Sequence, residues 1–201
     1  MSELSFRYAL HADVPPLVAL IERAYRSPET SGSWVSEAHL LKGPRTSNAE
    51  ISELISQPDS RFLIAERDGG ILGCCLIQRL GSTECTSADI GRGSAYFGMF
   101  AIDPTSHSTG LGKLILAEAE RRARELWRSS SMVMTVINLR DQLIEYYKRR
   151  GYALTGATMP FPFSETSGEV TRDFHLVEMK KPLDQHDPAG MVSGTDERGR
   201  Q

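Results

Sequence analysis

Residues 100–116, FAIDPTSHSTGLGKLIL, join an apolar segment to an amphipathic one through a polar turn. The apolar segment, Ser94–Ile102, predicts a long and largely buried strand, and the apolar spacing over residues 110–128 predicts a helix with one inward face. At such a turn the first helical amides have no partner within the helix, and Gly110 and Gly112 remove side-chain bulk around them. Because the helix dipole adds positive charge at the same place, the turn predicts a binding site for a diphosphate.

Two other glycine-containing phosphate loops fit this stretch less well. A Walker loop requires glycine where the chain has His107 and serine or threonine where it has Leu114, so this class is excluded. The dinucleotide-binding fingerprint requires a third glycine at the position of Ile115, and the stretch lies too late in the chain for a first βαβ unit. The turn is therefore interpreted as a phosphate site of another kind.

The elements expected around this stretch alternate late in the chain, which favours a mixed α/β sheet. Asp13 is expected to cap the first helix, Thr46 or Ser47 the second, and Gly151 to end the last. Residues 26–45 are expected to form a loop with a short helix, and residues 156–171 another loop. We expect strands at residues 6–10, 62–66, 71–80, 94–102, 132–137, 174–179 and from 152, and helices at 13–25, 47–57, 110–128 and 138–150.

Composition favours one globular domain without a strong electrostatic preference. The chain has 201 residues, of which 40% are hydrophobic, and a formal net charge of -3, so no basic field exists to hold nucleic acid or an anionic membrane. No apolar run approaches the roughly 20 residues that span a bilayer, and the first residues lack the character of a signal peptide, so a cytoplasmic location is expected. We expect a single domain over residues 1–181 and a disordered, polar tail over residues 182–201.

The three cysteines are Cys74, Cys75 and Cys85, and the first two are adjacent within an apolar strand. Neighbouring side chains of a strand point to opposite faces, so buried free thiols are expected rather than a disulfide or a metal pair. The five histidines show no zinc-ligand spacing with the cysteines, and no metal site is expected.

The polar turn also resembles a family motif. His107-Ser-Thr-Gly110-Leu-Gly112 is similar to the diphosphate loop of the GNAT acetyltransferase superfamily, which reads Gln or Arg, two residues, Gly, any residue, then Gly or Ala. A second block, Asn138 at a strand end followed by Tyr147-Lys-Arg-Arg-Gly151-Tyr152, resembles the family's later motif in order and spacing. The resemblance covers roughly residues 6–179. His107 departs from the usual Gln or Arg, which leaves the loop geometry intact but affects one side-chain phosphate contact.

The resemblance implies a GNAT fold, with a mixed, mostly antiparallel central sheet of six to seven strands flanked by about four helices. It also implies acetyl-CoA as the cosubstrate, with a strand backbone pairing with the pantetheine arm and a main-chain amide near Phe100 polarising the thioester carbonyl. A helix N-cap is the alternative interpretation of Asn138. The implied cofactor-binding residues are Phe100, Ala101, Ile102, His107, Ser108, Thr109, Gly110, Leu111, Gly112, Lys113 and Asn138.

Tyr147 is the implied catalytic acid, because a helix-end tyrosine of the family returns a proton to the leaving thiolate. Tyr146 is the competing candidate, but adjacent helix residues point about 100° apart and cannot share the role. Many relatives carry a glutamate base on the central strand, whereas residues 91–102 contain no acid, so a base acting through water is favoured. Glu37, His39 and Glu84 are the side-chain alternatives.

Candidate acceptor-binding residues lie in two segments. Phe161 and Phe163 alternate with prolines, and such aromatics form a stiff wall for an apolar part of a substrate. Packing beneath long loops is the alternative explanation for all of these side chains. The candidates are Trp34, Glu37, Arg45, Phe161 and Phe163.

We therefore expect an acetyl-CoA-dependent N-acetyltransferase that acts directly on a primary amine of a small molecule or peptide, without nucleic-acid or membrane partners. The alternative from another class is a non-catalytic acyl-CoA-binding sensor or interaction module, which the missing strand glutamate motivates. Transfer to oxygen, or of longer acyl groups, is a third option. The sequence leaves open the acceptor and the choice between a monomer and a homodimer.

Overall fold

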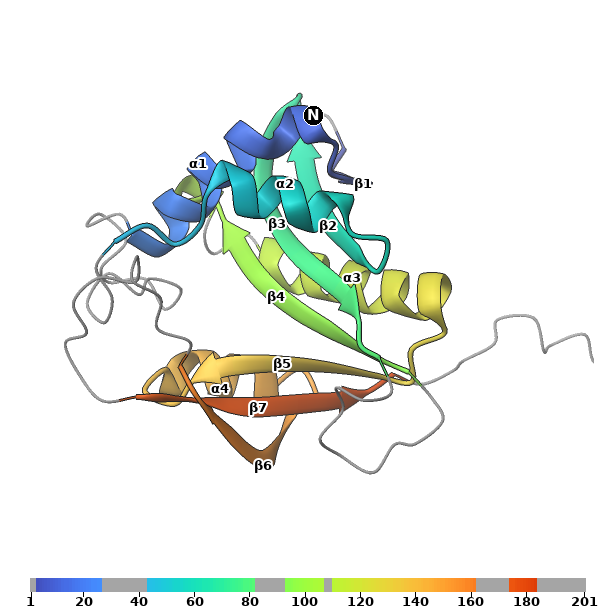
Figure 1. The fold of residues 1–201 in the computed structure, drawn as a ribbon, viewed down its shortest axis with the longest axis vertical. Helices are drawn as coiled ribbons and strands as arrows, with labels where there is room; N and C mark the ends of the chain where they lie inside the picture. Colours follow the sequence, from blue (N-terminus) through green and yellow to red (C-terminus); the bar gives the residue numbers. More distant parts are fainter. Residues whose placement is uncertain (1–2, 27–42, 82–92, 107–109, 162–173, 184–201) are drawn as a thin grey trace, which may run out of the picture.

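A mixed β-sheet with the strand order β1-β2-β3-β4-β5-β7-β6 forms the centre of the molecule (Figure 1). The structure, a computed structural model, describes residues 3–26, 43–81, 93–106, 110–161 and 174–183. Neighbouring strands are antiparallel except for the parallel pair β4 and β5, which confirms the predicted sheet. The strands in these residues are β1 (Ser5–Tyr8), β2 (Ser60–Arg67), β3 (Gly70–Arg79), β4 (Ser94–Ile102), β5 (Ser131–Ile137), β6 (Ala153–Pro160) and β7 (His175–Pro182).

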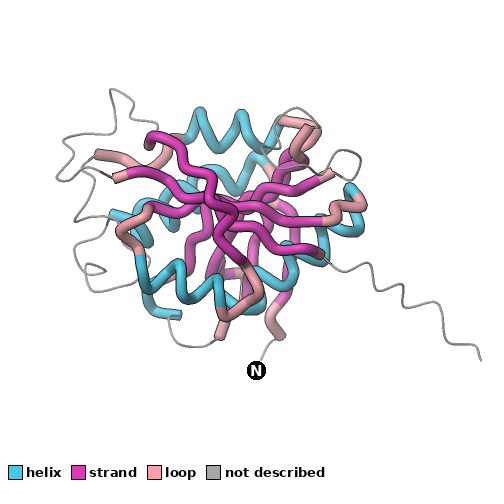
Figure 2. Tube along the Cα trace, turned by 90° about the horizontal axis from the view of Figure 1, so that it is seen from below, coloured by secondary structure: helices cyan, strands magenta, loops and turns pink. Residues whose placement is uncertain are grey.

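Helices cover both faces of this sheet (Figure 2). The α-helices in the described ranges are α1 (Val14–Arg26), α2 (Asn48–Ser56), α3 (Leu111–Trp127) and α4 (Asp141–Lys148). Cys74 is buried in the core beneath α1 and α2, and Cys75 is buried in the core beneath α3 and α4. Both thiols are free, so the predicted buried cysteines on opposite strand faces are confirmed. None of the described helices is long and apolar enough to cross a membrane.

β4 and β5 pair only at their starts and then diverge (Figure 1). Their parallel register ends where Tyr96 lies opposite Val133. Between Gly98 and Ala101 the register of β4 with β3 shifts, and Met99 in this bulge has a positive φ of 43°. Since a bulge bends its own strand, this one contributes to the divergence from β5.

The cap predicted at Asp13 differs in the structure. Its carboxylate accepts the amide of Leu10 at 2.7 Å and pairs with the Arg7 guanidinium at 2.7 Å. A cap at this position would bind amides two and three residues ahead, but these residues are Pro15 and Pro16, which have no N–H. The carboxylate therefore turns back towards β1 instead of capping α1.

Two further predicted caps have opposite outcomes. Ser47 Oγ accepts the amide of Glu50 at 3.2 Å, which confirms the cap of α2. By contrast, α4 begins after Arg140, and the side-chain oxygen of Asn138 accepts the amide of His175 at 3.0 Å. The N-cap interpretation of Asn138 is therefore wrong, because a turn separates it from the helix, and its side chain fastens the end of β5 to β7.

The C-terminal strands are longer than predicted. β6 continues to Pro160 through Gly156, which has a φ of 88° and lies where the register with β7 shifts. Most β6 side chains are exposed, so no alternation of polar and apolar residues marks the strand in the sequence. β7 is followed by the buried Leu183, whose amide donates to the Ser130 carbonyl at 2.8 Å. Of the predicted tail, residues 182–201, Pro182 belongs to β7 and Leu183 is buried, and residues 184–201 lie outside the described residues.

A buried ionic group joins α3 to the last strands. Glu120 of α3 is 7% exposed and accepts hydrogen bonds from the Tyr152 hydroxyl at 3.1 Å and from Lys181 Nζ at 2.7 Å. Burial raises the pKa of Tyr152, so its hydroxyl keeps the proton that it donates. Because Lys181 belongs to β7, this group fastens α3, which packs on β2–β4, to the β5–β7 part of the sheet.

Candidate active site

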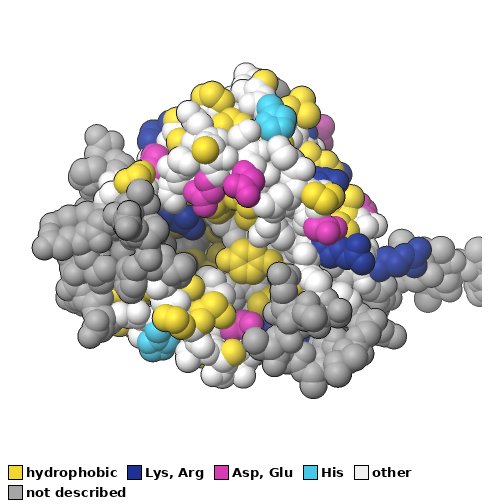
Figure 3. All heavy atoms as spheres, viewed as in Figure 1, with side chains coloured by type: hydrophobic (Ala, Val, Ile, Leu, Met, Phe, Trp, Pro, Cys, Tyr) yellow, Lys and Arg dark blue, Asp and Glu magenta, His cyan; other side chains and the backbone are white. Residues whose placement is uncertain are grey.

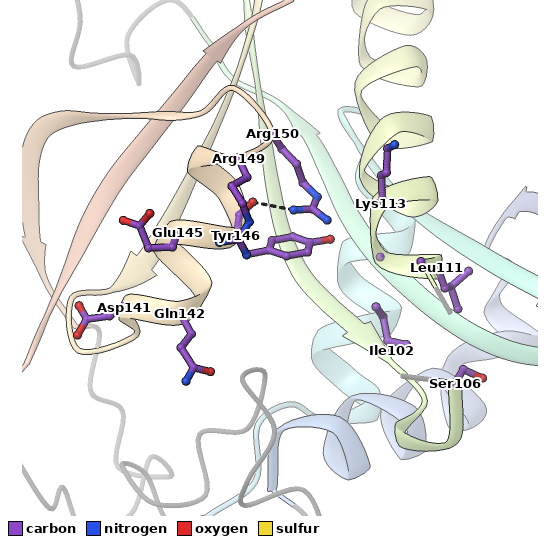
Figure 4. Close-up of a pocket in the computed structure, with 12 residues that line it drawn as sticks. Ile102, Ser106, Leu111, Lys113, Asp141, Gln142, Glu145, Tyr146, Arg149 and Arg150 are labelled. Atoms are coloured by element: carbon purple, nitrogen blue, oxygen red, sulfur yellow. Dashed lines mark hydrogen bonds between the residues drawn. The ribbon is translucent and has the colours of Figure 1, made fainter. Parts of the chain in front are cut away.

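A cleft with a volume of about 580 Å³ lies between the start of α3 and α4 (Figure 4). Its lining residues are Ile102, Ser106, Gly110, Leu111, Gly112, Lys113, Asp141, Gln142, Glu145, Tyr146, Arg149 and Arg150. The structure thus brings together Ile102 and residues 110–113, all of which the sequence places in a cofactor site. Residues 107–109, which include the predicted contacts His107, Ser108 and Thr109, lie outside the described residues.

Glycine backbone forms the α3 side of the cleft. Gly110 is the N-cap of α3 with a φ of 78°, a conformation that side-chain-bearing residues rarely adopt. Gly112 is buried, and a Cβ atom there would lie 2.8 Å from the Tyr146 hydroxyl oxygen and 3.0 Å from Ile102 Cδ1. The peptide groups at the start of α3 therefore form the wall themselves, as an anion site at a helix N-terminus requires.

Tyr146 and Arg150 form the opposite wall. The Arg150 Cζ atom lies 3.3 Å from the centroid of the Tyr146 ring, and Arg150 Nη1 donates to the Tyr146 carbonyl at 2.8 Å. Tyr146 is 8% exposed and extends from α4 towards α3 (Figure 4). An aromatic ring therefore holds a guanidinium at the edge of the cleft.

Tyr147, the predicted acid, lies in the core and not in the wall of this cleft. Its side chain is 4% exposed, and burial raises its pKa well above the ordinary value, with a further increase from Tyr25. The Tyr25 hydroxyl donates to the Phe100 carbonyl at 2.9 Å. The Tyr147 ring packs edge-on against Phe97 of β4, with ring centroids 6.4 Å apart, whereas the Tyr146 hydroxyl faces Gly112.

The β4 backbone after the bulge is the predicted partner of the pantetheine arm. The side chains of Phe100, Ala101 and Ile102 are buried, which leaves their peptide groups as the available part. One edge of this segment pairs with β3, and among the described strands no partner continues along its other edge beyond Tyr96. A strand edge of this kind accepts an extended ligand.

Two hydroxyl groups mark the point at which β4 and β5 separate. The Tyr96 hydroxyl on β4 and Thr135 Oγ1 on β5 lie 3.3 Å apart. The Tyr96 ring packs over Gly98, where a Cβ atom would lie only 2.5 Å from the ring. Gly98 therefore makes room for Tyr96, which the sequence predicts only as part of a buried strand.

The described acceptor candidates lie apart from the cleft. The Arg45 guanidinium lies 5.2 Å from the centroid of the Tyr25 ring, and its amide donates to Glu22 Oε1 at 2.5 Å. Phe161 packs edge-on against Phe174 with ring centroids 5.0 Å apart. The other acceptor and base candidates, Trp34, Glu37, His39, Glu84 and Phe163, lie outside the described residues.

Most of the α4 wall is missing from the sequence-based site. The spacing of these side chains is the signal that could have revealed it, because residues four apart share one face of a helix. Two such rows, 141-145-149 and 142-146-150, line the cleft. The lining residues without a predicted binding role are Ser106, Asp141, Gln142, Glu145, Tyr146, Arg149 and Arg150.

Solved structures share this architecture. The Arabidopsis thaliana NAA60 structure in complex with acetyl-CoA has a TM-score of 0.66 and 13% identity, with 90% of this chain and 99% of that chain covered. The ribosomal-protein-S18-alanine N-acetyltransferase of Escherichia coli has a TM-score of 0.62 and 14% identity over 93% and 98% of the chains. For the paia N-acetyltransferase of Thermoplasma acidophilum in complex with coenzyme A the TM-score is 0.59 and the identity 16%, over 90% and 99%.

Sequence comparison gives the family. An IAA acetyltransferase of Azospirillum brasilense is 28% identical over 109 residues, which are 54% of this chain and 65% of the relative, so less than two thirds of that relative is matched. The model of the acetyltransferase (GNAT) family matches residues 22–152. Since that match includes the bulged strand and both walls of the cleft, the chain belongs to the GNAT acetyltransferase family.

Proposed function

We propose that this chain transfers the acetyl group of acetyl-CoA directly to a primary amine of a small molecule or peptide. The observation that carries the proposal is the divergence of β4 from β5 beside the cleft at the start of α3. An anion site and an open strand edge then lie next to each other, as a nucleotide with a long thioester arm requires. Acetyl-CoA is the cosubstrate of the family, and two of the compared structures contain acetyl-CoA or coenzyme A.

The residues of the cleft suit the diphosphate of acetyl-CoA. The first amides of α3 carry the partial positive charge of the helix terminus, and Lys113 adds a full charge beside them. The space in front of Gly112 is one that even a methyl group would obstruct. We assign the diphosphate to residues 107–113, the arm to the backbone of residues 100–102, and a contact with the arm to the Asn138 amide group.

The chemical step forms a C–N bond and breaks the C–S bond of the thioester. An alkylamine with a pKa near ~10 must first lose a proton, which we assign to water because β4 carries no carboxylate or imidazole side chain. Tyr147 then gives its proton to the leaving sulfur. Its raised pKa keeps the hydroxyl protonated until that step, and its packing against Phe97 of β4 supports this role over that of Tyr146, whose hydroxyl faces Gly112.

The described cysteines favour direct transfer over an acyl-enzyme. Cys74 and Cys75 are both 0% exposed, and burial raises the pKa of Cys74 to about 12. A thiolate is the nucleophilic form of cysteine, so neither residue is suited to carry an acyl group. Among the described cysteines none competes with direct attack of the amine on the thioester.

An approach for the amine is available on the face that carries α1 and α2. Figure 3 shows a hollow between the β1–β4 part and the β5–β7 part of the molecule, with hydrophobic side chains around it. We assign acceptor binding to this side, with Trp34, Glu37, Arg45, Phe161 and Phe163 as contacts. The net charge of -3 gives a cationic amine a mild attraction, and a cytoplasmic location is part of the proposal.

Mass spectrometry of a metabolite and peptide library incubated with the protein and acetyl-CoA tests the function. We expect at least one product heavier by an acetyl group on a primary amine. Firm coenzyme A binding in calorimetry without any acetylated product would instead support the non-catalytic sensor, which the absence of an acid on β4 favours. If the protein does not bind coenzyme A, both functions are rejected.

A further inference from the structure

Arg150 is a cation in the cleft without a carboxylate partner among the described residues. By contrast, the arginines Arg121 and Arg122 of α3 both form ion pairs with Glu118. The Arg150 guanidinium contacts Tyr146, through its carbonyl at 2.8 Å and its ring at 3.3 Å. Arg150 Nε is buried and has no hydrogen-bond partner in the described part of the chain. A buried donor without a partner is unfavourable, so the guanidinium is not fully satisfied by the described residues.

The Tyr146 ring sets the position of this guanidinium relative to α3. The guanidinium lies over the ring, and the hydroxyl at the far end of the ring faces Gly112. Tyr146 therefore lies next to both Arg150 and the first turn of α3. In Figure 4 the Arg150 side chain extends from the end of α4 into the space between α4 and the helix that carries Lys113.

The charges along the cleft distinguish its two ends. Asp141 and Glu145 lie at one end, and Glu145 already pairs with Lys148 at 2.8 Å. Lys113 and Arg150 lie at the other, next to the open amides of α3. A polyanion is repelled from the acidic end and attracted to the basic end, so the phosphates belong beside Arg150.

We propose that Arg150 binds the diphosphate of coenzyme A from the α4 side, opposite the amides of residues 110–112. This inference rests on the proposed function, since it takes coenzyme A as the ligand. A guanidinium presents donors in a planar fork that matches phosphate oxygens, and the bond to the Tyr146 carbonyl fixes its orientation in advance. Arg150 thereby supplies a permanently charged side chain for a loop in which His107 stands at the position of the usual Gln or Arg.

Calorimetric titration of Arg150→Met with coenzyme A and with 3′-dephospho-coenzyme A tests the proposal. We expect both ligands to bind about 10- to 100-fold more weakly than to the wild-type protein, as the loss of a charge-assisted hydrogen bond implies. Arg150→Lys keeps the charge and should recover part of the affinity. The control is Arg67→Met, because Arg67 is an exposed arginine at the end of β2 that does not line the cleft, and we expect a change below about 3-fold.

Three results would overturn the assignment. Unchanged affinity of a folded Arg150→Met protein rules out any phosphate contact. A loss for coenzyme A but not for the dephospho ligand moves the contact to the 3′-phosphate. Equal losses in Arg150→Met and Arg67→Met indicate a general charge effect. Thermal melting without ligand verifies folding, and Arg150→Lys replaces Arg150→Met if the latter unfolds, with a loss of about 3-fold or more expected for both ligands. Firm wild-type binding in the same titrations keeps the family function intact whichever way the variants behave.

Discussion

Gly112 determines how closely the first turn of α3 approaches Tyr146. A methyl group there would lie 2.8 Å from the Tyr146 hydroxyl and 3.2 Å from Phe100 Cζ, so one of these side chains must move. We expect Gly112→Ala to reduce coenzyme A affinity by roughly 10-fold and the free energy of unfolding by about 1–2 kcal/mol, as for an overpacked core. Calorimetry and urea denaturation measure the two effects.

Gly93→Ala is the matched control for this substitution. A Cβ atom at Gly93 has no heavy atom within 4 Å, and the residue has no positive φ. Both quantities should therefore stay close to those of the wild-type protein. Equal losses in the two variants would mean that the close contact at Gly112 has no special importance.

Tyr147→Phe removes the proposed acid but keeps the buried ring. We expect kcat to fall on the order of 100-fold, the lower range for general acid catalysis, while coenzyme A affinity remains unchanged. Because the pKa of Tyr147 lies well above 10.0, the hydroxyl stays protonated as the pH rises, and the ratio of wild-type to variant kcat should be constant from pH 7 to pH 9. Steady-state kinetics at several pH values measure this ratio.

Tyr146→Phe is the control for Tyr147→Phe. The Tyr146 hydroxyl faces Gly112, at the end of the cleft to which we assign the diphosphate, so we do not expect it to act on the thioester. Turnover of this variant should stay within about 3-fold of the wild-type value. A large loss of kcat in Tyr146→Phe together with normal turnover in Tyr147→Phe would exchange the two assignments.

At the level of single residues the sequence predicts one wall of the cleft and misses the other. Gly110 and Gly112 are identifiable because a strand-to-helix turn with glycines has a local pattern. Arg150 is not, since a charged residue at a helix end is usually solvated, and its stacking on Tyr146 depends on how α4 packs. The position of Tyr147 in the core likewise depends on tertiary packing that no periodicity encodes.

Among the elements, β1 is held by an ionic group that predicts a pH dependence. Arg7 joins Asp13 at 2.7 Å to Glu66 of β2 at 2.8 Å, and the hydrogen bonds from Arg7 lower the pKa of Asp13 below its usual 3.8. A lowered pKa in the folded state means that the stabilisation is present above about pH 4 and is lost as the pH falls through the folded-state value. We expect Asp13→Asn to reduce the free energy of unfolding by about 1–2 kcal/mol at pH 7, with the difference from wild type shrinking between pH 4 and pH 2.

Urea denaturation across this pH range measures the difference. Asp59→Asn serves as the control, because the side chain of Asp59 is 60% exposed and lies 3.9 Å from an equally exposed Arg79. Its effect should stay below about 0.5 kcal/mol at every pH. A wild-type to Asp13→Asn difference that does not change with pH would contradict an ionic origin of the stabilisation.

Elements with a clear pattern of apolar residues are predicted well, whereas elements that depend on pairing with a distant segment are not. The apolar run of β4 gives its observed limits, Ser94–Ile102, because six of its nine residues are buried and none is exposed. β6 is underestimated because its exposed residues acquire strand geometry only by pairing with β7. The misplaced start of α4 has a similar cause, since the bond between Asn138 and His175 joins segments that lie 37 residues apart.

At the scale of the whole molecule, β4 and β5 pair over only a short stretch, so α3 helps to join the β1–β4 part of the sheet to the β5–β7 part. Glu120 is the centre of that connection, with Tyr152 and Lys181 as its partners. We expect Glu120→Gln to reduce the free energy of unfolding by about 3 kcal/mol, because Lys181 then loses the carboxylate that compensates its partly buried charge. Urea denaturation followed by circular dichroism measures the change.

Glu125→Gln is the corresponding control on the same helix. Glu125 pairs with Arg121 one turn away, and its side chain is 55% exposed. A loss below about 0.5 kcal/mol is expected for such a surface pair. If the two substitutions destabilise the protein equally, the contact between α3 and β7 does not hold the parts together.

The adjacent cysteines of β3 have a practical consequence. Cys74 and Cys75 face the cores on opposite sides of the sheet, so an alkylating reagent reaches either sulfur only when the core that covers it opens. Once Cys85 is replaced by serine, the rate of iodoacetamide modification measures how often these two cores open. The two native thiols thus report transient local unfolding of the protein without a dye or an engineered label.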